Sequence, residues 1–423
     1  MAKVVVVGGG GREHAIVRAL INGGRGPQAS AREVVAIPGN PGIARDARCV
    51  RASGEVEALV AACLGVRPDL VVVGPEAPLA AGLADALAKQ GIPCFGPTAA
   101  AARIESSKAF AKEVMAAAGV LTAETAVFAD AAEARRHARA RGACVVKVDG
   151  LAAGKGVIVA DDGPSAEAAV DELAALHPGQ PLLVEERLVG RELSVIAFTD
   201  GERVLPLPPA RDHKRLLDGD RGPNTGGMGA VSPPPDATDA LLAEVVRTVL
   251  EPTVRALSQR GTPFRGALYA GLMLTPQGIR VLEFNCRLGD PEAQAMLIRL
   301  RSDPLPLFLG AANGDLRGLT AEWDPRPSVA VVIAAAGYPA SPRAGDAING
   351  LEELSNDEGD DLWILHAGTK RSGDKVVSAG GRVLTVAALG DDVPAARAKA
   401  YAAVAGVKLA GSQHRTDVAA AEG

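Results

Sequence analysis

Val281-Leu282-Glu283-Phe284-Asn285-Cys286-Arg287 is a run in which two aliphatic residues are followed by alternating polar and apolar side chains. Alternation with a period of two predicts a β-strand, and side chains two positions apart on a strand share a face. We therefore expect Glu283, Asn285 and Arg287 to project together, with Leu282 and the other apolar residues of the run packed behind them. The alternative is an ordinary strand whose polar face meets solvent.

The three polar groups of this strand suit a site for a metal ion and phosphate. Carboxylate and amide oxygens are good ligands of Mg²⁺, which takes few protein ligands and completes its shell with phosphate oxygens and water. A guanidinium adds a two-pronged donor for a phosphate or a carboxylate. Glu283 and Asn285 are accordingly the predicted metal ligands, and Arg287 is the predicted contact to an anionic substrate.

Length and composition narrow the class of protein. The chain has 423 residues, 48% of them hydrophobic, which suggests about three domains with cores of their own. The net charge of −5 gives no reason to expect nucleic acid or an anionic membrane as a partner. The five cysteines form no CxxC pair, as is typical of reduced thiols. The apolar run after Met1 is shorter than a signal peptide, and no stretch approaches the roughly 18 apolar residues of a membrane span. We expect a cytoplasmic protein.

The chain opens with the pattern of a doubly wound α/β domain. The β-branched run Lys3–Val7 is followed by four glycines and a helical pattern over Arg12–Leu20. A dinucleotide fingerprint would need a glycine where Glu13 stands, and the next predicted strand, Glu33–Ile37, ends without an acid for a ribose. What remains is a nest of backbone N–H groups at a helix N-terminus, which suits a single phosphate. A purely structural turn is the alternative.

The rest of this domain places a carboxylate at the edge of the predicted sheet. Glu76 follows the strand Leu70–Val73, and ligands bind beyond the carboxyl ends of strands in open α/β sheets. A helix around Glu55–Leu64 and a short strand at Ile92–Phe95 complete the pattern, and Pro97 ends the domain.

The middle of the chain contains a glycine loop between two predicted strands, Cys144–Val148 and Val157–Ala160. The loop, Gly150–Gly156, differs from a Walker A sequence because its first two glycines are one residue too close and a glycine replaces the Ser or Thr that holds Mg²⁺. No helix follows the loop. We therefore expect a hairpin flap over nucleotide phosphates, with Lys155 at its tip and Lys147 in its first strand. A plain surface hairpin is the alternative.

Two further segments suit a nucleotide. A predicted helix over Ser106–Ala118 carries Lys108 in its first turn, against the helix dipole, which an anionic ligand would justify. The predicted strand Leu182–Leu188 runs into Glu185 and Glu186, and such a segment can offer backbone groups to adenine and a carboxylate to ribose. The alternatives are a solvated lysine and an ordinary acidic strand end.

A polar, glycine-rich region covers Arg211–Arg215 and Gly222–Gly229. Long loops in compact domains are usually functional or disordered, and we favour an ordered substrate loop. A long helix over Ala240–Leu257 and a hairpin of Gly266–Leu274 with Gly278–Asn285 follow. The other predicted elements are the strand Glu192–Phe198, the helix Asp290–Leu300, strands at Ser328–Ala335, Ala347–Leu351, Leu362–Ala367 and Gly381–Leu389, and the helix Ala395–Val404.

Motifs of one protein family run in order along nearly the whole chain. They are Gly9–Ala15, Val73–Leu79, Phe95–Thr98, Asp149–Val157, Asp212–Arg215, Gly222–Gly229, Tyr269–Met273, Val281–Glu292, which begins with the run quoted first, and His366–Thr369. With them the chain resembles the glycinamide ribonucleotide synthetase (phosphoribosylamine–glycine ligase) family of ATP-grasp enzymes. So many motifs in one order are far more specific than any of them alone.

The resemblance implies an α/β and α+β multidomain fold. Residues 1–101 would form a doubly wound parallel-sheet domain that binds phosphoribosylamine. Residues 102–326 would form an ATP-grasp domain with a mobile lid at about 121–190, and residues 327–423 a mixed α+β domain. The implied reaction, a step of purine biosynthesis, joins glycine to 5-phosphoribosylamine. It uses ATP with Mg²⁺ or Mn²⁺, passes through glycyl phosphate, and gives glycinamide ribonucleotide, ADP and phosphate.

The resemblance also implies a set of site residues. Those expected at the ATP site are Lys108, Lys147, Gly154, Lys155, Gly156, Glu185, Glu186, Leu188 and Glu192. Those expected to hold glycine and the transferring phosphate are Asp212, Asn224, Thr225, Arg287 and Asp290, with Arg287, Lys155 and Asp212 in catalytic roles. Those expected to hold phosphoribosylamine are Gly10, Gly11, Arg12, Glu76, Lys370 and Arg382.

Three other readings of the sequence remain open at this stage. One is an ATP-grasp ligase that uses bicarbonate or formate, one is a catalytically silent nucleotide-binding protein, and the weakest is a dehydrogenase. Many ATP-grasp enzymes carry a second metal-binding acid on the preceding strand, but Ala267–Met273 contains none, so the number of metal ions is open. We expect small-molecule partners only, in a monomer or a weak homo-oligomer.

Overall fold

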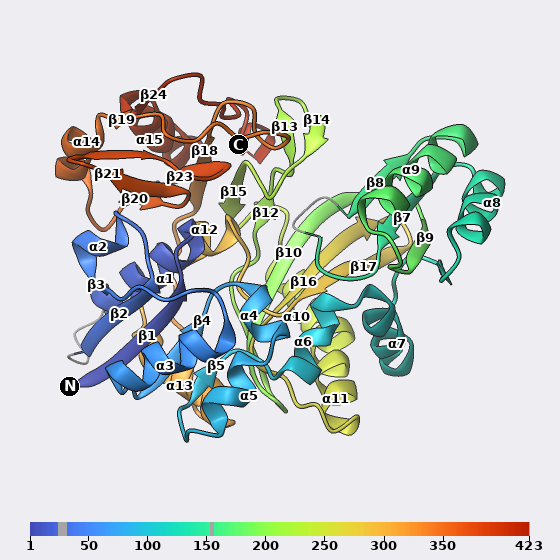
Figure 1. Cartoon of the computed structure of the whole chain (residues 1–423), viewed down its shortest axis with the longest axis horizontal. Helices are drawn as coiled ribbons and strands as arrows, with labels where there is room; N and C mark the ends of the chain where they lie inside the picture. The colour runs from blue at the N-terminus through green and yellow to red at the C-terminus, as the bar shows by residue number, and fades with distance from the viewer. Residues whose placement is uncertain (24–31, 153–155, 423) are drawn as a thin grey trace.

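The computed structural model describes residues 1–23, 32–152 and 156–422. Its first domain is a parallel sheet in the order β3-β2-β1-β4-β5, with helices on both faces (Figure 1). On β1, Val4 and Val6 pack into the core beneath α1, while Val5 and Val7 pack into the core beneath α3. The elements are β1 (Ala2–Gly8), α1 (Gly11–Asn22), β2 (Arg32–Pro38), α2 (Ile43–Asp46), β3 (Arg48–Cys49), α3 (Val56–Val66), β4 (Leu70–Val73), α4 (Glu76–Ala80), α5 (Leu83–Ala88) and β5 (Cys94–Phe95). The predicted doubly wound domain is confirmed.

Two helices connect this domain to the middle of the chain, where the sequence predicts one. They are α6 (Ala99–Ser106) and α7 (Lys108–Ala118). Ser107 separates them, because its backbone is extended and its hydroxyl caps α7 by accepting a hydrogen bond from the Phe110 N–H at 3.1 Å. Of the two serines at the start of the predicted helix, Ser106 and Ser107, the second is therefore the cap. Helix α6 was missed because its alanine-rich sequence has little apolar periodicity.

The lid is a small unit with a core of its own. It is an antiparallel sheet in the order β6-β9-β7-β8 with two helices packed on it, and it projects from the rest of the molecule at the right of Figure 1. Its elements are β6 (Thr125–Phe128), α8 (Ala131–Arg141), β7 (Cys144–Val148), β8 (Val157–Ala160), α9 (Gly163–Leu176) and β9 (Leu182–Glu186). Strands β7 and β8 pair antiparallel, so the predicted hairpin is confirmed.

The body of the predicted ATP-grasp domain is a sheet in the order β11-β10-β16-β17. The strands are β10 (Arg191–Asp200), β11 (Val204–Pro206), β16 (Arg265–Thr275) and β17 (Gly278–Asn285). The helix predicted over Ala240–Leu257 is broken into α10 (Asp239–Val245), a π-helical turn (Val246–Leu250) and α11 (Glu251–Gln259). Pro252 lacks an N–H to donate to the preceding turn, which explains the break.

Strand β17 corrects the simple alternation expected for the opening stretch. The pairing with β16 shifts between Gly271 and Leu272, so that Gly271 is opposite Glu283 and Leu272 is opposite Val281. Leu282 is the extra residue of a β-bulge. It therefore turns to the cavity described below, and Val281 takes the place in the core that the alternation assigned to Leu282. Phe284 and Cys286 pack in the core as expected.

The C-terminal sheet draws strands from two parts of the chain. Its order is β12-β15-β18-β23-β20, and β12 and β15 come from the predicted substrate loop. These strands are β12 (Arg211–Asp212), β15 (Gly229–Ser232), β18 (Ser328–Ala334), β20 (Leu362–His366) and β23 (Arg382–Leu389). The sheet thus continues across the boundary proposed at residues 326 and 327, and Figure 1 shows β12 and β15 beneath the C-terminal strands.

Several short elements complete the fold. The predicted substrate loop also contains a hairpin, and the predicted strand Ala347–Leu351 shrinks to β19 because Leu351 begins α14. The predicted helix Asp290–Leu300 shortens to α12. The remaining elements are β13 (Arg215–Leu217), β14 (Arg221–Asn224), α12 (Glu292–Leu297), α13 (Pro304–Asn313), β19 (Ile348–Asn349), α14 (Leu351–Asp357), β21 (Thr369–Ser372), β22 (Lys375–Ser378), α15 (Val393–Gly406), β24 (Lys408–Leu409) and a final 3₁₀ turn (Ala420–Glu422). Within the described ranges, none of the helices combines the length and apolar character needed to span a membrane.

Candidate active site

A cavity of about 500 Å³ lies where the first domain, the lid, the ATP-grasp body and the C-terminal domain meet. Many of the residues predicted from the sequence line it. They are Arg12, Glu76, Lys108, Lys147, Gly156, Glu185, Asp212, Thr225, Glu283, Asn285, Arg287, Asp290 and Arg382. These residues come from elements far apart in the chain, so the fold has gathered them.

The wall formed by β17 carries the predicted metal ligands, Glu283 and Asn285. Burial alone would raise the pKa of Glu283, but the charges of Lys214, Lys147 and Lys108 outweigh burial and lower it. A carboxylate with a lowered pKa is ionised and ready to meet a cation. Among the residues that the structure describes, no group of three His, Cys, Asp or Glu side chains is arranged to hold a metal ion. A cation at Glu283 and Asn285 would therefore take its other ligands from a substrate or water.

Carbonyl groups at the β-bulge connect β17 to the lid. The Lys147 ammonium on β7 donates to the Leu282 carbonyl at 3.0 Å, so the first strand of the lid hairpin is tied to the strand that carries the metal ligands. Next to it, the Thr122 hydroxyl donates to the Val281 carbonyl at 2.6 Å. Both bonds join the lid side of the cavity to its floor, and both use carbonyls at the bulge.

Glu185 sits between two lysines. Its carboxylate is 3.0 Å from Lys112 Nζ on α7 and 2.8 Å from Lys147 Nζ, and the residue is only 2% exposed. Burial lowers the pKa of Lys112, and Glu185 works against that effect. The carboxylate predicted for a ribose is thus already engaged with protein cations. Lys112 was not predicted as a site residue.

Arg287 is held by two carboxylates. Its Nε is 3.0 Å from Glu76 Oε2, and its Nη2 is 3.0 Å from Glu105 Oε1. The other oxygen of Glu105 accepts from the Cys286 N–H at 2.7 Å. Burial alone would lower the pKa of Arg287, but the charges of Glu105 and Glu76 outweigh burial and raise it. A guanidinium fixed on one side presents its remaining N–H groups in one direction, which prepares it for an anion.

The first domain adds a second arginine beside Arg287. The Leu288 carbonyl accepts from Arg12 Nη1 at 3.2 Å and from Arg287 Nη1 at 3.3 Å. Arg12 Nε also pairs with Glu13 Oε1 at 2.7 Å. Two guanidinium groups therefore share one anchor at the cavity wall.

An acidic group lies on the side of the substrate loop. Burial raises the pKa of Asp212 to about 8, with Glu292, Glu192 and Glu283 adding to it and Lys214 opposing it. The Glu292 carboxylate accepts hydrogen bonds from Tyr269 Oη at 2.9 Å and Ser194 Oγ at 3.1 Å. Strand β16 carries no acid itself, and the carboxylate beside its Tyr269 comes instead from Glu292 of α12.

The C-terminal domain closes the cavity through Arg382 and Tyr338. Arg382 Nη1 donates to the carbonyls of Gly226 at 2.5 Å and Asp290 at 2.6 Å, and lies 3.2 Å from the Asp290 carboxylate. The Tyr338 hydroxyl accepts from the Gly226 N–H at 3.0 Å. The two side chains hold the end of the substrate loop against the turn after β17.

Family models account for nearly the whole chain. The model described as phosphoribosylglycinamide synthetase, N domain, matches residues 2–105. The models for the ATP-grasp (A) domain and the C domain of the same protein match residues 106–293 and 328–421. A phosphoribosylamine–glycine ligase of Streptomyces coelicolor is 52% identical over 421 residues, covering 99% of this chain and 99% of that protein. The chain belongs to the phosphoribosylglycinamide synthetase family.

Solved structures agree with this family. The phosphoribosylamine–glycine ligase of Thermotoga maritima superimposes with a TM-score of 0.82 at 32% identity, over 98% of this chain and 100% of that one. The biotin carboxylase domain of a Hydrogenobacter thermophilus 2-oxoglutarate carboxylase, solved with MgADP and bicarbonate, has a TM-score of 0.71 at 18% identity, over 97% and 91% of the two chains. The second likeness concerns the fold alone. The ATP-grasp domain of the family implies the use of ATP.

Some predicted residues of the family site do not line the cavity. They are Gly10, Gly11, Glu186, Leu188, Glu192, Asn224 and Lys370. Glu192 pairs with Lys214 at 2.6 Å, and Lys370 is exposed on β21. Gly154 and Lys155 lie outside the residues that the structure describes. For all of these, a ligand role stays a prediction.

The glycine turn of the family's first domain is built around Glu13. The Gly10 N–H donates to Glu13 Oε2 at 2.5 Å, so one donor of the predicted phosphate nest is already in use. A Cβ on Gly8, whose φ is +123°, would meet the Glu13 side chain at 2.6 Å. Glu13, the residue that breaks the dinucleotide fingerprint, therefore caps α1. Its side chain also fills the space that a Cβ at position 8 would need, which accounts for Gly8.

Sequence reasoning missed several residues that line the cavity. They are Glu105, Lys112, Lys214, Tyr269, Glu292 and Tyr338. Lys214 and Glu292 stand within motifs that had been singled out, so position in a motif was an available signal. Glu105 and Lys112 lie in helical segments whose local pattern says only that they are polar. Their roles come from partners distant in the chain.

Proposed function

We propose that the chain is an ATP-dependent ligase that joins glycine to 5-phosphoribosylamine, giving glycinamide ribonucleotide, ADP and phosphate in purine biosynthesis. The observation that carries this proposal is the cavity wall on β17. There, in a chain of the phosphoribosylglycinamide synthetase family, the Glu283 and Asn285 pair faces Lys108, Lys147 and Arg287. That arrangement combines cation ligands with positive charge for phosphates and for a carboxylate.

The first chemical step would activate glycine. A glycine carboxylate oxygen attacks the γ-phosphorus of ATP, an O–P bond forms, the bond to the β-phosphate oxygen breaks, and ADP leaves. Phosphoryl transfer depends chiefly on positioning and on offsetting charge. Lys108 and Lys147 supply that charge, and Arg287 orients the carboxylate. Lys155, predicted at the tip of the flap, would complete the set.

The second step would form the amide. The amine of 5-phosphoribosylamine attacks the carbonyl carbon of glycyl phosphate, the C–O bond to phosphate breaks, phosphate leaves, and the nitrogen loses a proton. Asp212 suits a contact to the ammonium group of glycine, because a positive charge beside its buried carboxyl lowers the raised pKa and favours the ionised form. Arg12 with Glu76 at one side, and Arg382 with Asp290 at the other, would receive phosphoribosylamine. Because acyl phosphates hydrolyse, we infer that the lid closes over the cavity during the reaction.

A divalent cation fits the donor set of β17. Glu283 is ionised by its lysine neighbours, and Asn285 adds a neutral oxygen, which together suit Mg²⁺ or Mn²⁺. Glu283 and Asn285 would hold it. When bound, such an ion neutralises charge on the phosphate oxygens of ATP.

Product analysis tests the proposed function. The full chain is incubated with ATP, Mg²⁺ and single or paired substrates, and ADP release is followed together with the ligated product. We expect ADP release that requires both glycine and 5-phosphoribosylamine. Equal ADP release with bicarbonate or formate in place of glycine would overturn the proposal and favour another ATP-grasp ligase.

We further propose that the enzyme works in the cytoplasm as a monomer or a weak homo-oligomer. All five cysteines are free thiols in the structure, which suits a reducing compartment. Light scattering at several protein concentrations tests the oligomeric state. A mass that stays at twice the 43.0 kDa of the chain on dilution would contradict a weak association.

A further inference from the structure

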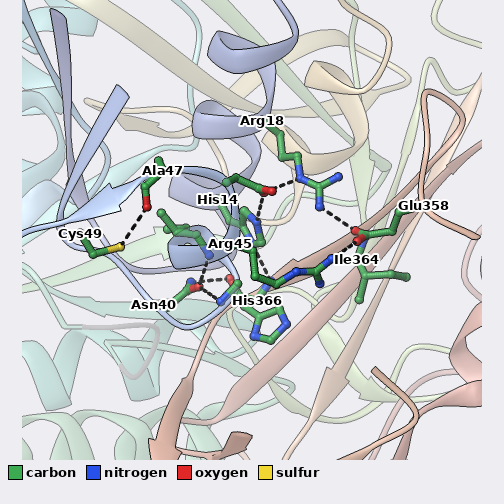
Figure 2. A network of polar contacts seen from close by, with 12 residues as sticks. His14, Arg18, Asn40, Arg45, Ala47, Cys49, Glu358, Ile364 and His366 are labelled. Carbon is green, nitrogen blue, oxygen red and sulfur yellow. Dashed lines mark hydrogen bonds and ion pairs between the residues drawn. The ribbon is translucent and has the colours of Figure 1, made fainter. Parts of the chain in front are cut away.

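The junction between the first and C-terminal domains contains an amide whose donors and acceptors are all used. Asn40 follows β2 and is 8% exposed. Its Nδ2 donates to the Gly9 carbonyl at 2.9 Å and to the His366 carbonyl at 2.8 Å. Its Oδ1 accepts from the N–H groups of Gly42 and Ile43, both at 2.9 Å. Figure 2 shows Asn40 beside His366, with its bonds drawn as dashed lines.

The two carbonyls that Asn40 joins belong to segments from different domains. Gly9 opens the turn that leads through Gly10 to Arg12, whose side chain lines the cavity. His366 ends β20 and leads through a short turn to Lys370 on β21. The family resemblance assigns Arg12 and Lys370 to phosphoribosylamine, and the structure places Arg12 at the cavity and Lys370 on the exposed side of β21. One side chain therefore joins the two segments that carry these residues.

A pair of buried histidines reinforces the same junction. His14 Nδ1 accepts from the His366 N–H at 2.8 Å, so the ring proton of neutral His14 lies on Nε2, which is 3.2 Å from Asp46 Oδ2. A Cβ on Gly42 would meet the His366 ring at 2.5 Å and the His14 ring at 2.6 Å. The chain after Asn40 thus fits closely between the two imidazoles.

Charged pairs form an outer part of the junction. Glu358, before β20, pairs with Arg18 at 2.9 Å and with Arg45 at 3.2 Å. The Arg45 side chain is 41% exposed, and Figure 2 shows it reaching Glu358 away from Asn40. These pairs hold the domains together, but within the described part of the chain they make no hydrogen bond or ion pair with the glycine turn. The junction therefore offers a structural contact and a candidate positioning contact that can be changed separately.

We propose that Asn40 is a positioning residue of the phosphoribosylamine subsite. It acts through the Gly9 carbonyl and the His366 carbonyl, and it holds the glycine turn and the Lys370 segment at a fixed spacing. The inference rests on the proposed function and deepens it. Asn40 lies behind the cavity wall and does not take part in the chemistry.

Two substitutions separate the bridge from the turn before α2. Asn40→Asp keeps the oxygen that accepts from Gly42 and Ile43, but it replaces the donating NH₂ with an oxygen that repels both carbonyls. Asn40→Ser keeps a short side-chain oxygen for the N–H groups of that turn and removes the bridge with little repulsion. Arg45→Ala is the matched control, because it weakens the outer part of the same junction.

Initial rates with each substrate varied in turn give the test. We expect at least a tenfold higher KM for 5-phosphoribosylamine in Asn40→Asp and a smaller rise in Asn40→Ser, with the KM values for ATP and glycine within twofold of wild type. Arg45→Ala should leave all three KM values within twofold. Thermal unfolding shows whether each variant is folded. If Asn40→Asp is unfolded, the KM values of Asn40→Ser test the role of Asn40.

Two outcomes would overturn the inference. One is an unchanged KM for 5-phosphoribosylamine in both folded Asn40 variants, and the other is an equal change of all three KM values. Failure of the proposed function looks different, because the wild-type chain itself would then form no product from glycine and 5-phosphoribosylamine. A wild type that turns over and variants that match it would reject the role of Asn40 alone.

Discussion

The cavity wall and the domain junction both contain buried polar groups, but the interaction partners of those groups differ between the two places. At the junction, protein partners meet the polar groups: Asn40 makes four hydrogen bonds, and Glu358 accepts from two arginines and from the Ile364 N–H at 2.8 Å. At the cavity, burial lowers the pKa of Lys108, whose ammonium donates to a backbone carbonyl. Lys108, Lys147 and Lys214 together surround Glu283.

This difference indicates that the charged groups of the junction contribute to stability, whereas those of the cavity are arranged for ligands. A buried pair contributes to folding when its partners satisfy it, and breaking it leaves a costly unpaired charge. Several lysines gathered around one carboxylate, as at Glu283, repel one another, and this arrangement is useful when a polyanion arrives to balance their charge. Changes at the cavity should therefore lower activity, and changes at the charged pairs of the junction should lower stability. Asn40 should differ from those pairs, because it also holds the glycine turn that leads to Arg12.

The largest effect should come from Glu283→Gln. It removes the one carboxylate of the proposed metal pair while keeping its shape, so we expect about a 10³-fold fall in kcat/KM, or about 4 kcal/mol. Steady-state kinetics at saturating Mg²⁺ measures the loss, and a circular dichroism spectrum like that of the wild type shows that the fold is kept. Full turnover in the folded variant would contradict the metal role of Glu283.

Glu358→Ala should show the reverse signature. The change leaves Arg18 and Arg45 without their shared carboxylate, and we expect it to lower the free energy of unfolding by about 3 kcal/mol. The value of kcat should stay within about twofold of wild type. Urea unfolding and steady-state rates measure the two quantities. Glu353→Ala, an exposed carboxylate of α14, is the control, and an equal loss of stability there would argue against the junction.

Glu105→Gln should give a smaller loss of activity. The glutamine can still bond Arg287 or the Cys286 N–H but no longer fixes the guanidinium with a charge, so we expect about a 30-fold fall in kcat, or about 2 kcal/mol. Glu113→Gln, on the exposed side of α7, is the matched control and should behave as wild type. The proposed holding of Arg287 fails if both variants lose the same activity.

The smallest effect is a dependence of stability on pH at the junction. Burial lowers the pKa of His14, and it lowers the pKa of His366 to about 3. An unfolded histidine titrates near 6.5, so the unfolded chain takes up more protons below that pH, and stability falls as pH falls from 6.5. Each histidine contributes at most about 1.4 kcal/mol per pH unit.

Urea unfolding at pH 7.0, 6.0 and 5.0 measures this dependence in a range above most carboxylate titrations. His366→Asn removes one of the two titrating groups, so its free energy of unfolding should fall less steeply below pH 6.5 than that of the wild type. An identical slope in the two proteins would show that His366 does not titrate on unfolding in this range.

Much of the fold could be predicted because its signals are local. Strands β4, β7, β8 and β17 begin and end at the predicted residues, since β-branched runs with glycine or charge at their ends are patterns of neighbouring residues. The single helix predicted over Ser106–Ala118 missed α6. The substrate loop was harder to predict, because β12 and β15 are short, β12 pairs with β15, and β15 gains its other partner from β18, about a hundred residues later.

The residues of the site also divide into those with a local signal in the sequence and those without one. Motif order indicated Glu283, Asn285 and Arg287, which share one strand, and the structure places all three at the cavity. Glu105 was missed because its role depends on Arg287, and Lys112 was missed because its role depends on Glu185. A single polar residue in a helix looks the same whether it faces solvent or a partner from another element.

By itself, the sequence determined the alternation that makes β17 a strand, the glycine turn that rejects a dinucleotide, and the family to which the motifs belong. The tertiary structure alone decided that a bulge turns Leu282 toward the cavity and frees its carbonyl for Lys147, and that Asn40 joins two domains. The physical reason is the separation along the chain of the residues that interact. Alternation and capping act between neighbours along the chain, whereas the balance of buried charge depends on which distant segments the folded chain brings together.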